Sequence, residues 1–94
     1  MTDITALHAG LETYVGALRR HLEELRERHR VLEQSVAPLT ELYAGRGAER
    51  FFEVFNAADY QFRTYQEQGE IVLSLLLTKL EELARIDEVS RHEL

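Results

Sequence analysis

The chain has 94 residues, of which 45% are hydrophobic and 30% are charged, so it can form one thin domain and is not disordered by composition. Acidic residues outnumber basic ones in residues 1–42 and again in residues 43–94, and the net charge is −6. This balance excludes the dense basic surface that binds nucleic acid or anionic membranes. One Pro and five Gly are too few for the turns of a small sheet protein, which favours a few long helices.

A first helix is predicted to begin at Asp3, a suitable N-cap, and to run to about Val36 or a little beyond, within about 3–40. Its apolar residues recur in steps of three and four, which places them on one face. Two successive steps of four around Leu18 predict a local stutter in helix packing. The predicted stripe comprises Ile4, Leu7, Leu11, Tyr14, Leu18, Leu22, Leu25, Leu32, Val36 and Leu39, with His29 in the one gap.

The chain is predicted to reverse direction between about residues 42 and 47. Pro38 lacks an N–H group and disfavours helical geometry at the residue before it, so it should kink or end the first helix. Gly45 and Gly47, two residues apart, are the strongest turn signal in the sequence.

A second helix is predicted over about 48–90, a length typical of helical hairpins and coiled coils. Its predicted packing stripe comprises Phe51, Phe55, Ala58, Phe62, Tyr65, Gly69, Val72, Leu76, Leu80, Leu83 and Ile86. A second stripe lies beside and opposite the first, and it comprises Phe52, Ile71, Leu73, Leu75 and Leu77. The first helix can cover only one side of the apolar segment 71–77.

These patterns predict an all-α fold, with residues 1–94 forming a single antiparallel two-helix hairpin. Because the hairpin leaves one apolar side uncovered, we expect it to dimerise into a four-helix bundle. The predicted dimer interface contains Leu73, Leu77, Phe52 and Ile71. The partner is then a second copy of the chain or a related helical-hairpin chain, and the sequence does not choose between them.

The turn carries the most specific motif in the chain. Tyr43, Ala44 and Gly45 lie at mid-chain and are followed by Gly47, with Phe51 eight residues after the tyrosine and Phe55 four residues later. This arrangement resembles the WXG-hundred, or ESAT-like, family of type VII secretion substrates, with Tyr43 in place of the family's Trp. The resemblance spans essentially the whole chain. It implies a turn motif of Tyr43, Gly45 and Gly47, and helix packing by Phe51 and Phe55 near the turn.

The resemblance implies a small secreted or secretion-associated protein that acts by protein–protein association, with a secretion ATPase or a toxin cargo as further partners. Export would need no cleaved signal peptide, and none is expected from the N-terminal sequence. The family's Tyr-x-x-x-Asp/Glu export signal is missing, because the residues four after each Tyr are Leu18, Gly47, Thr64 and Gly69. In paired systems that signal often lies on one partner. The alternative is a cytoplasmic helical adaptor or secretion chaperone unrelated to type VII export.

No catalytic, cofactor or metal site is expected, and the protein is predicted not to be an enzyme. With no Cys, thiolate metal sites and nucleophilic cysteines are excluded. The sequence contains no His-x-x-x-His or Glu-x-x-His pair, and His21-x-x-Glu24 is a single ligand-like pair. His29 is expected to be buried among apolar neighbours, where protonation would cost free energy and acid pH would destabilise the fold. The most apolar run, 71–77, is too short to cross a membrane, so no membrane insertion is expected.

Overall fold

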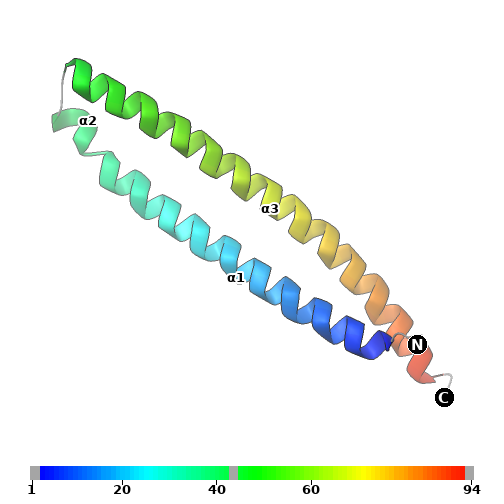
Figure 1. The fold of residues 1–94 in the computed structure, drawn as a ribbon. Coiled ribbons are helices and arrows are strands. Elements are labelled where there is room, and N and C mark those ends of the chain that lie inside the picture. Colours follow the sequence, from blue (N-terminus) through cyan, green and yellow to red (C-terminus); the bar gives the residue numbers. More distant parts are fainter. Residues whose placement is uncertain (1–2, 43–44, 93–94) are drawn as a thin grey trace.

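The computed structural model describes residues 3–42 and 45–92, and over these residues it is a helical hairpin without strands. Helix α1 spans Ile4–Val36, the short helix α2 spans Leu39–Leu42, and helix α3 spans Arg46–His92. Figure 1 shows α1 and α3 running antiparallel along their whole length, with the two ends of the chain at one end of the hairpin and α2 at the other. The molecule measures 73 × 17 × 16 Å. The predicted all-α hairpin is therefore confirmed.

The start and end of α1 follow from local sequence. The Asp3 side chain accepts hydrogen bonds from the backbone N–H groups of Thr5 and Ala6, as an N-cap does. At the other end, α1 stops at Val36, two residues before Pro38. The chain then makes a tight turn into α2, in which the Thr40 and Glu41 N–H groups donate to the carbonyls of Ala37 and Pro38. Pro38 thus divides the segment predicted to form one helix over about 3–40.

Gly45 lies directly before α3 with a φ of +105°, a conformation that strains any L side chain. Its carbonyl accepts the first α3 hydrogen bond, from the Glu49 N–H at 3.0 Å. Gly47 belongs to the first turn of α3, which begins at Arg46, so Gly47 is not part of the reversal as predicted. Tyr43 lies outside the described residues, and its predicted role in the turn remains a prediction.

Two pairs of residues define how α1 and α3 fit together. A Cβ atom on Gly69 would lie 2.6 Å from Leu22 Cδ2, so the missing side chain makes room for this leucine. The ring of His29 stacks on the ring of Phe62, with the ring centroids 5.4 Å apart. His29 lies seven residues after Leu22 in α1, and Phe62 lies seven residues before Gly69 in α3. Equal seven-residue steps in opposite directions are the register of an antiparallel coiled coil.

The contact stripe of α1 differs from the predicted one in its first half. Leu7 and Tyr14 are exposed, whereas the neighbouring His8 is half-buried and Val15 is buried. The stripe that faces α3 therefore comprises Ile4, His8, Leu11, Val15, Leu18, Leu22, Leu25, His29 and Val36. Its steps alternate four and three without interruption up to His29, so the predicted stutter at Leu18 is absent.

About half of the contact stripe predicted for α3 is confirmed. Phe55, Phe62, Gly69, Leu76 and Leu83 recur every seven residues at less exposed positions, as expected. The intervening positions lie one residue later than predicted, because Phe51, Ala58, Tyr65, Val72 and Ile86 are exposed. Their places in the stripe are taken by Phe52, Asp59, Gln66, Leu73 and Asp87, while Leu80 is half-buried as predicted.

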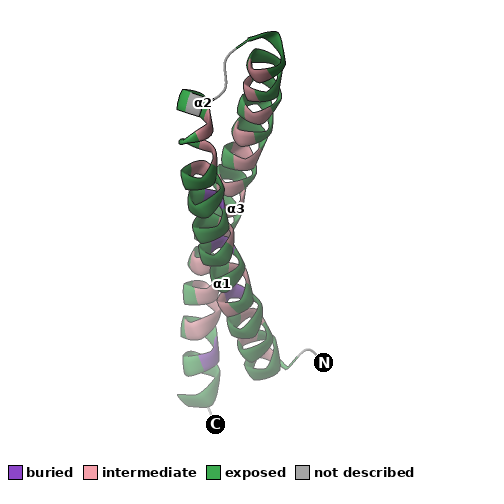
Figure 2. Ribbon diagram, turned by 90° about the vertical axis from the view of Figure 1, so that its left-hand side faces the viewer, coloured by how far each residue is buried: buried purple, intermediate pink, exposed green. Residues whose placement is uncertain are grey.

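The hydrophobic core is confined to this single line of contact. Val15 and Leu22, each 4% exposed, are the buried hydrophobic residues of the described chain, while His29 and Asp87 are its buried polar ones. Figure 2 shows buried residues along the line where the helices meet and exposed residues over most of the surface. Each helix is covered from one side, so burial elsewhere requires another chain. None of the helices in residues 3–42 and 45–92 is long and apolar enough to cross a membrane.

Candidate functional site

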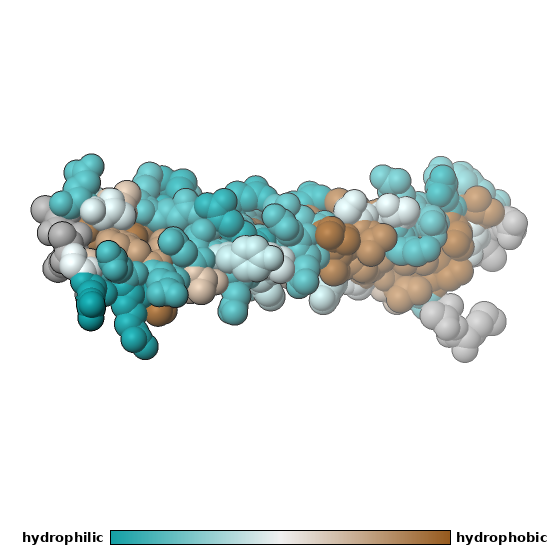
Figure 3. Space-filling view, turned by 90° about the horizontal axis from the view of Figure 1, so that it is seen from above, coloured by the Kyte–Doolittle hydropathy of each residue, from teal (hydrophilic) through white to brown (hydrophobic). Residues whose placement is uncertain are grey.

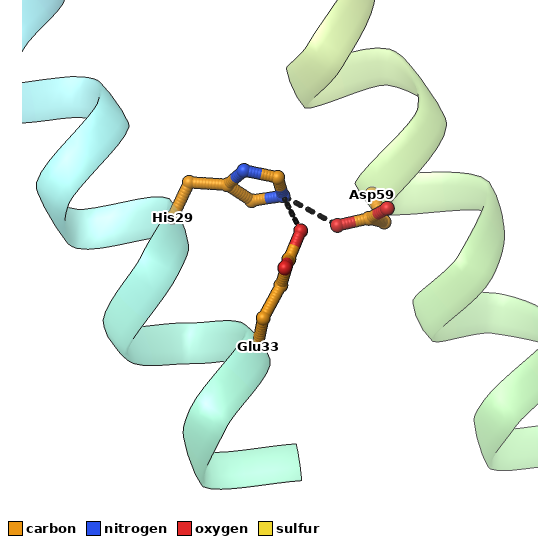
Figure 4. Close-up of side chains that lie close together, drawn as sticks. All are labelled: His29, Glu33 and Asp59. Atoms are coloured by element: carbon orange, nitrogen blue, oxygen red, sulfur yellow. Dashed lines mark hydrogen bonds and ion pairs between the residues drawn. The ribbon is translucent and has the colours of Figure 1, made fainter. Parts of the chain in front are cut away.

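A polar cluster bridges the two helices toward the turn end of the hairpin. His29 and Glu33 lie one turn apart on α1, and Asp59 faces them from α3 (Figure 4). His29 Nε2 lies 3.1 Å from Glu33 Oε1 and within hydrogen-bond distance of Asp59 Oδ1. In the described part of the chain, these three side chains form a group of possible metal ligands, because their ligand atoms all lie within 4.8 Å of one another.

Arg63 completes the cluster from the next turn of α3. Its Nε donates to Asp59 Oδ2 at 2.9 Å, and its Nη2 donates to Glu33 Oε1 at 2.9 Å. The pKa of the Asp59 carboxyl is held below its ordinary value, chiefly by the hydrogen bond to His29 and further by Arg63, against the opposing effect of partial burial. Asp59 is therefore a carboxylate at neutral pH.

The surroundings of His29 differ from those expected for a histidine in an apolar stripe. The residue is 9% exposed and one ring face stacks on Phe62, but its Nε2 faces two carboxylates. The expectation of purely apolar neighbours is wrong. The expected acid destabilisation rested on apolar neighbours, which the structure does not place around Nε2.

A small pocket of about 300 Å³ opens beside the cluster, between the end of α1 and the first half of α3. Apolar side chains and the carboxylates and guanidinium of the cluster share its walls. Its lining residues are Glu33, Val36, Ala37, Thr40, Phe52, Phe55, Asn56, Asp59 and Arg63. Water or a small ligand therefore has access to the polar cluster from this side.

A second set with the same residue types lies at the other end of the hairpin. His8 and Glu12 are one turn apart on α1, and Asp87 faces them from α3. Here His8 Nδ1 lies 3.2 Å from Asp87 Oδ2, while Nε2 lies 3.3 Å from Glu12 Oε1. Thr5 Oγ1 also donates to Asp87 Oδ1 at 2.5 Å. The two carboxylates therefore occupy different ring nitrogens and do not converge on one point.

Both sets arise because the contact stripes contain polar residues that meet across the helix pair. Asp59 and Asp87 both occupy stripe positions of α3, and His8 and His29 both occupy stripe positions of α1. Pairing satisfies these groups, and no buried side-chain N or O atom of the described residues lacks a hydrogen-bond partner. The sequence held one cue to the clusters, a Glu four residues after each of these histidines.

Two ion pairs show which residues share one side of the hairpin. Arg26 bonds Glu70, and Glu33 bonds Arg63, in each case across the helix pair. Arg26, Arg63 and Glu70 each come one position after a contact-stripe residue. Glu33 comes one position after Leu32, which continues the three-and-four repeat of α1 although it is exposed. Positions that follow the stripe therefore lie on the same side of both helices, and we call this side the polar face.

Positions one residue before the stripe are about 160° around the helix from those one residue after it, given 3.6 residues per turn. They consequently share the opposite side of the hairpin, which we call the apolar face. All but three of the exposed large hydrophobic side chains of the described chain belong to it; the exceptions are Leu32, Tyr60 and Ile71. The apolar face comprises Leu7, Tyr14 and Val31 of α1, and Phe51, Val54, Tyr65, Val72, Leu75, Ile86 and Val89 of α3. Val31 and Val89 precede Leu32 and Ser90, which continue the repeats of their helices although both are exposed.

The apolar side chains are not spread evenly over the surface. Figure 3 shows hydrophobic surface concentrated toward the end of the hairpin where the termini lie, with a smaller area toward the turn and a hydrophilic zone between them. Polar residues on the apolar face include His21, Glu24 and Arg28 of α1 and Gln61 and Gln68 of α3 in the middle of the hairpin. Lys79 and Glu82 of α3 also lie on this face, between Leu75 and Ile86, where they form an ion pair.

The residues predicted for the dimer interface fall on different sides of α3. Phe52 and Leu73 occupy the contact stripe toward α1, and both are half-buried within the hairpin. Leu77 is half-buried on the polar-face side, whereas Ile71 is 60% exposed on the outer side of α3. The predicted packing residue Phe55 lies in the contact stripe, and Phe51 is 49% exposed on the apolar face. The four residues predicted for the interface do not form one surface.

Comparison with known proteins places the chain in no established group. No family model, curated protein or solved structure matches it. Function is therefore argued from the geometry of the chain itself.

Proposed function

We propose that the protein is a non-enzymatic association module that binds another helical hairpin through its apolar face, giving a four-helix bundle. The observation that supports this is the gathering of exposed apolar side chains on one side of both helices, opposite the two interhelical ion pairs. A helix pair with one apolar and one polar face is suited to packing against a second pair on the apolar side.

The size of the apolar face suits a stable complex. The whole side of the hairpin that includes the apolar face, 73 Å long and 17 Å wide with its polar middle, is on the order of 1,000 Å², compared with roughly 800 Å² per partner in a standard interface. The side chains of the apolar face are substantially exposed in the single hairpin, with Leu75 at 63% and Val54 at 64%. Burying a large aliphatic side chain contributes about 1.5–3 kcal/mol, so several together offset the cost of ordering two chains.

The partner we favour is a second copy packed antiparallel to the first. Apolar residues lie at both ends of the apolar face, so turning one copy end for end places apolar surface on apolar surface. A related hairpin with the same pattern is the second candidate partner.

We further propose that this association serves a type VII-like secretion system, as a small ESAT-like secreted or secretion-associated protein. The support is the resemblance of the turn sequence together with the hairpin architecture and the positive φ of Gly45. Export without a cleaved signal is tested by recovering the intact protein from the medium when the secretion ATPase is active and not when it is deleted. Recovery from the cytoplasm alone in an active system favours the adaptor or chaperone alternative.

The association itself is tested by placing a charge on or off the apolar face. Leu75→Glu puts a carboxylate in the middle of the proposed interface, and Ile71→Glu puts one at a similarly exposed position on the outer side of α3. Sedimentation equilibrium should give about twice the 10.9 kDa chain mass for the wild type and for Ile71→Glu, and a monomer for Leu75→Glu. Equal effects of the two substitutions would contradict the assignment of the face.

A further inference from the structure

We propose that His29, Glu33 and Asp59 form a binding site for one divalent transition-metal ion, with Zn²⁺ as the best match. The donor set is one imidazole nitrogen and two carboxylate oxygens, which zinc accepts and which leaves a fourth position open. Two ligands come from α1 and one from α3, so a bound ion would link the two helices near the turn. This site is separate from the proposed association through the apolar face.

The three donor atoms already converge on one point. Figure 4 shows the His29 Nε2 directed between the Glu33 and Asp59 carboxylates. Ligands at about 2.0–2.2 Å from a tetrahedral zinc ion lie roughly 3–3.5 Å from one another. The distance from Nε2 to Glu33 Oε1 is 3.1 Å, and all donor atoms lie within 4.8 Å. Small rotations of the side chains therefore suffice to bind the ion.

The ion would occupy the position of a proton on His29 Nε2. A hydrogen on this nitrogen points at the two carboxylates, and a zinc ion placed there contacts the same three atoms with a larger charge.

The surroundings also fit a metal site. Arg63 Nε bonds Asp59 Oδ2 and leaves Oδ1 directed at the cluster, which is the kind of second contact that orients a ligating carboxylate. The Arg63 bond to Glu33 Oε1 competes with the ion, and Glu33 can release it because this glutamate is half-exposed. The adjoining 300 Å³ pocket has room for a water molecule at the open coordination position.

The other end of the hairpin provides a matched control. His8, Glu12 and Asp87 have the same residue types and the same spacing on α1, but their carboxylates contact different ring nitrogens. The two nitrogens of an imidazole point away from each other, so one ion cannot reach both carboxylates while bound to the ring. Zinc should therefore distinguish the two sets.

The test is a zinc titration of the full chain after treatment with a chelator. Calorimetry, or competition with a chromogenic chelator, should show one Zn²⁺ per chain. His29→Ala and Glu33→Gln should each weaken binding at least tenfold, whereas His8→Ala should change it less than twofold. Circular dichroism of each variant checks that the hairpin still forms.

Two results would overturn the proposal. The first is an absence of binding at one equivalent, with no more affinity than exposed carboxylates provide. The second is an equal loss of affinity for His8→Ala and for His29→Ala, or no loss for Glu33→Gln. If His29→Ala fails to fold, Glu33→Gln decides the outcome, because its side chain is 39% exposed and its removal leaves the contact stripe intact. Neither result bears on dimerisation, which sedimentation measures independently.

Discussion

The two ends of the hairpin contain the same three kinds of residue in two different arrangements. At the turn end, Glu33 and Asp59 converge on one nitrogen of His29. At the end where the termini lie, Glu12 and Asp87 contact opposite nitrogens of His8. Spacing on α1 is equal in the two sets, but the register that pairs His29 with Phe62 places Asp59 on the Glu33 side of His29. The same register places Asp87 on the side of His8 away from Glu12, so the position of the aspartate across the helix pair determines whether a cluster can act as one site.

The hydroxyl group of Thr5 explains part of the difference. Thr5 donates to one oxygen of Asp87, and the His8 ring approaches the other. At the turn end, Arg63 Nε donates to Asp59 Oδ2, and His29 faces the other oxygen of that carboxylate, Oδ1. The turn-end set in addition borders a pocket.

The largest expected effect comes from removing the contact between Leu22 and Gly69, which aligns α1 with α3 between the two ends of the hairpin. Leu22→Ala removes the buried side chain that fills the space beside Gly69, and it should lower the free energy of unfolding by about 2–4 kcal/mol. Urea denaturation measures the loss. Ile71→Ala, at an exposed position of α3, is the control and should change stability by less than about 0.5 kcal/mol. Similar losses in both variants would show that the Leu22 contact does not determine the register.

A smaller effect, limited to the turn end, is expected from Gly45→Val. The φ of +105° is unfavourable for a β-branched residue, so the substitution should cost more than about 1 kcal/mol, as urea denaturation measures it. Gly47→Ala is the control, because a Cβ added to this α3 residue would meet no atom within 4 Å. Alanine there should stabilise the helix by up to about 1 kcal/mol. Effects of the same sign at both glycines would contradict the assigned turn geometry.

The smallest expected effect is on the stability of the fold at acid pH, and it arises from Asp87 at the end of the hairpin where the termini lie. The pKa of Asp87 is held below its ordinary value, chiefly by the Thr5 hydrogen bond and then by His8 and Arg91, against partial desolvation. Its contribution is therefore present above the unfolded pKa of about 3.9 and is lost as pH falls through the lower folded value. Asp87→Asn should therefore weaken the dependence of the thermal midpoint of unfolding on pH between about pH 5 and pH 3.

The matched substitution at an exposed acid tests whether this acid response is specific. Glu53→Gln, at an exposed position of α3, should leave the dependence of the midpoint on pH unchanged. An unaltered acid slope in Asp87→Asn would mean that Asp87 does not couple folding to pH.

The hairpin was predictable because its signals are local. Asp3 caps a helix through its own neighbours, Pro38 ends one through its missing N–H, and Gly45 permits a φ that other residues avoid. The two long apolar repeats then leave few alternatives to an antiparallel pair. These features act within a few residues of sequence and need no knowledge of the partner helix.

The contact stripes and the polar clusters were less predictable, because they depend on the register between helices. Val72 is about as apolar as Leu73, and Tyr65 is more apolar than Gln66, so periodicity alone chose the wrong neighbours. Asp59 and Asp87 are carboxylates in stripe positions, and only the histidines that face them make those positions favourable. A pattern of hydrophobic residues cannot reveal such pairs.

The apolar face is the central claim, and two adjacent residues test it most directly. The chain has no cysteine, so Val72→Cys and Ile71→Cys each introduce a single thiol, on the apolar face and on the outer side of α3 respectively. Val72 lies near the middle of α3, where an antiparallel two-fold pairing brings it close to its own copy. Under mild oxidation at micromolar concentration, Val72→Cys should form a disulfide-linked dimer much faster than Ile71→Cys. Equal rates, or faster linkage through Ile71→Cys, would contradict association of a second copy through this face.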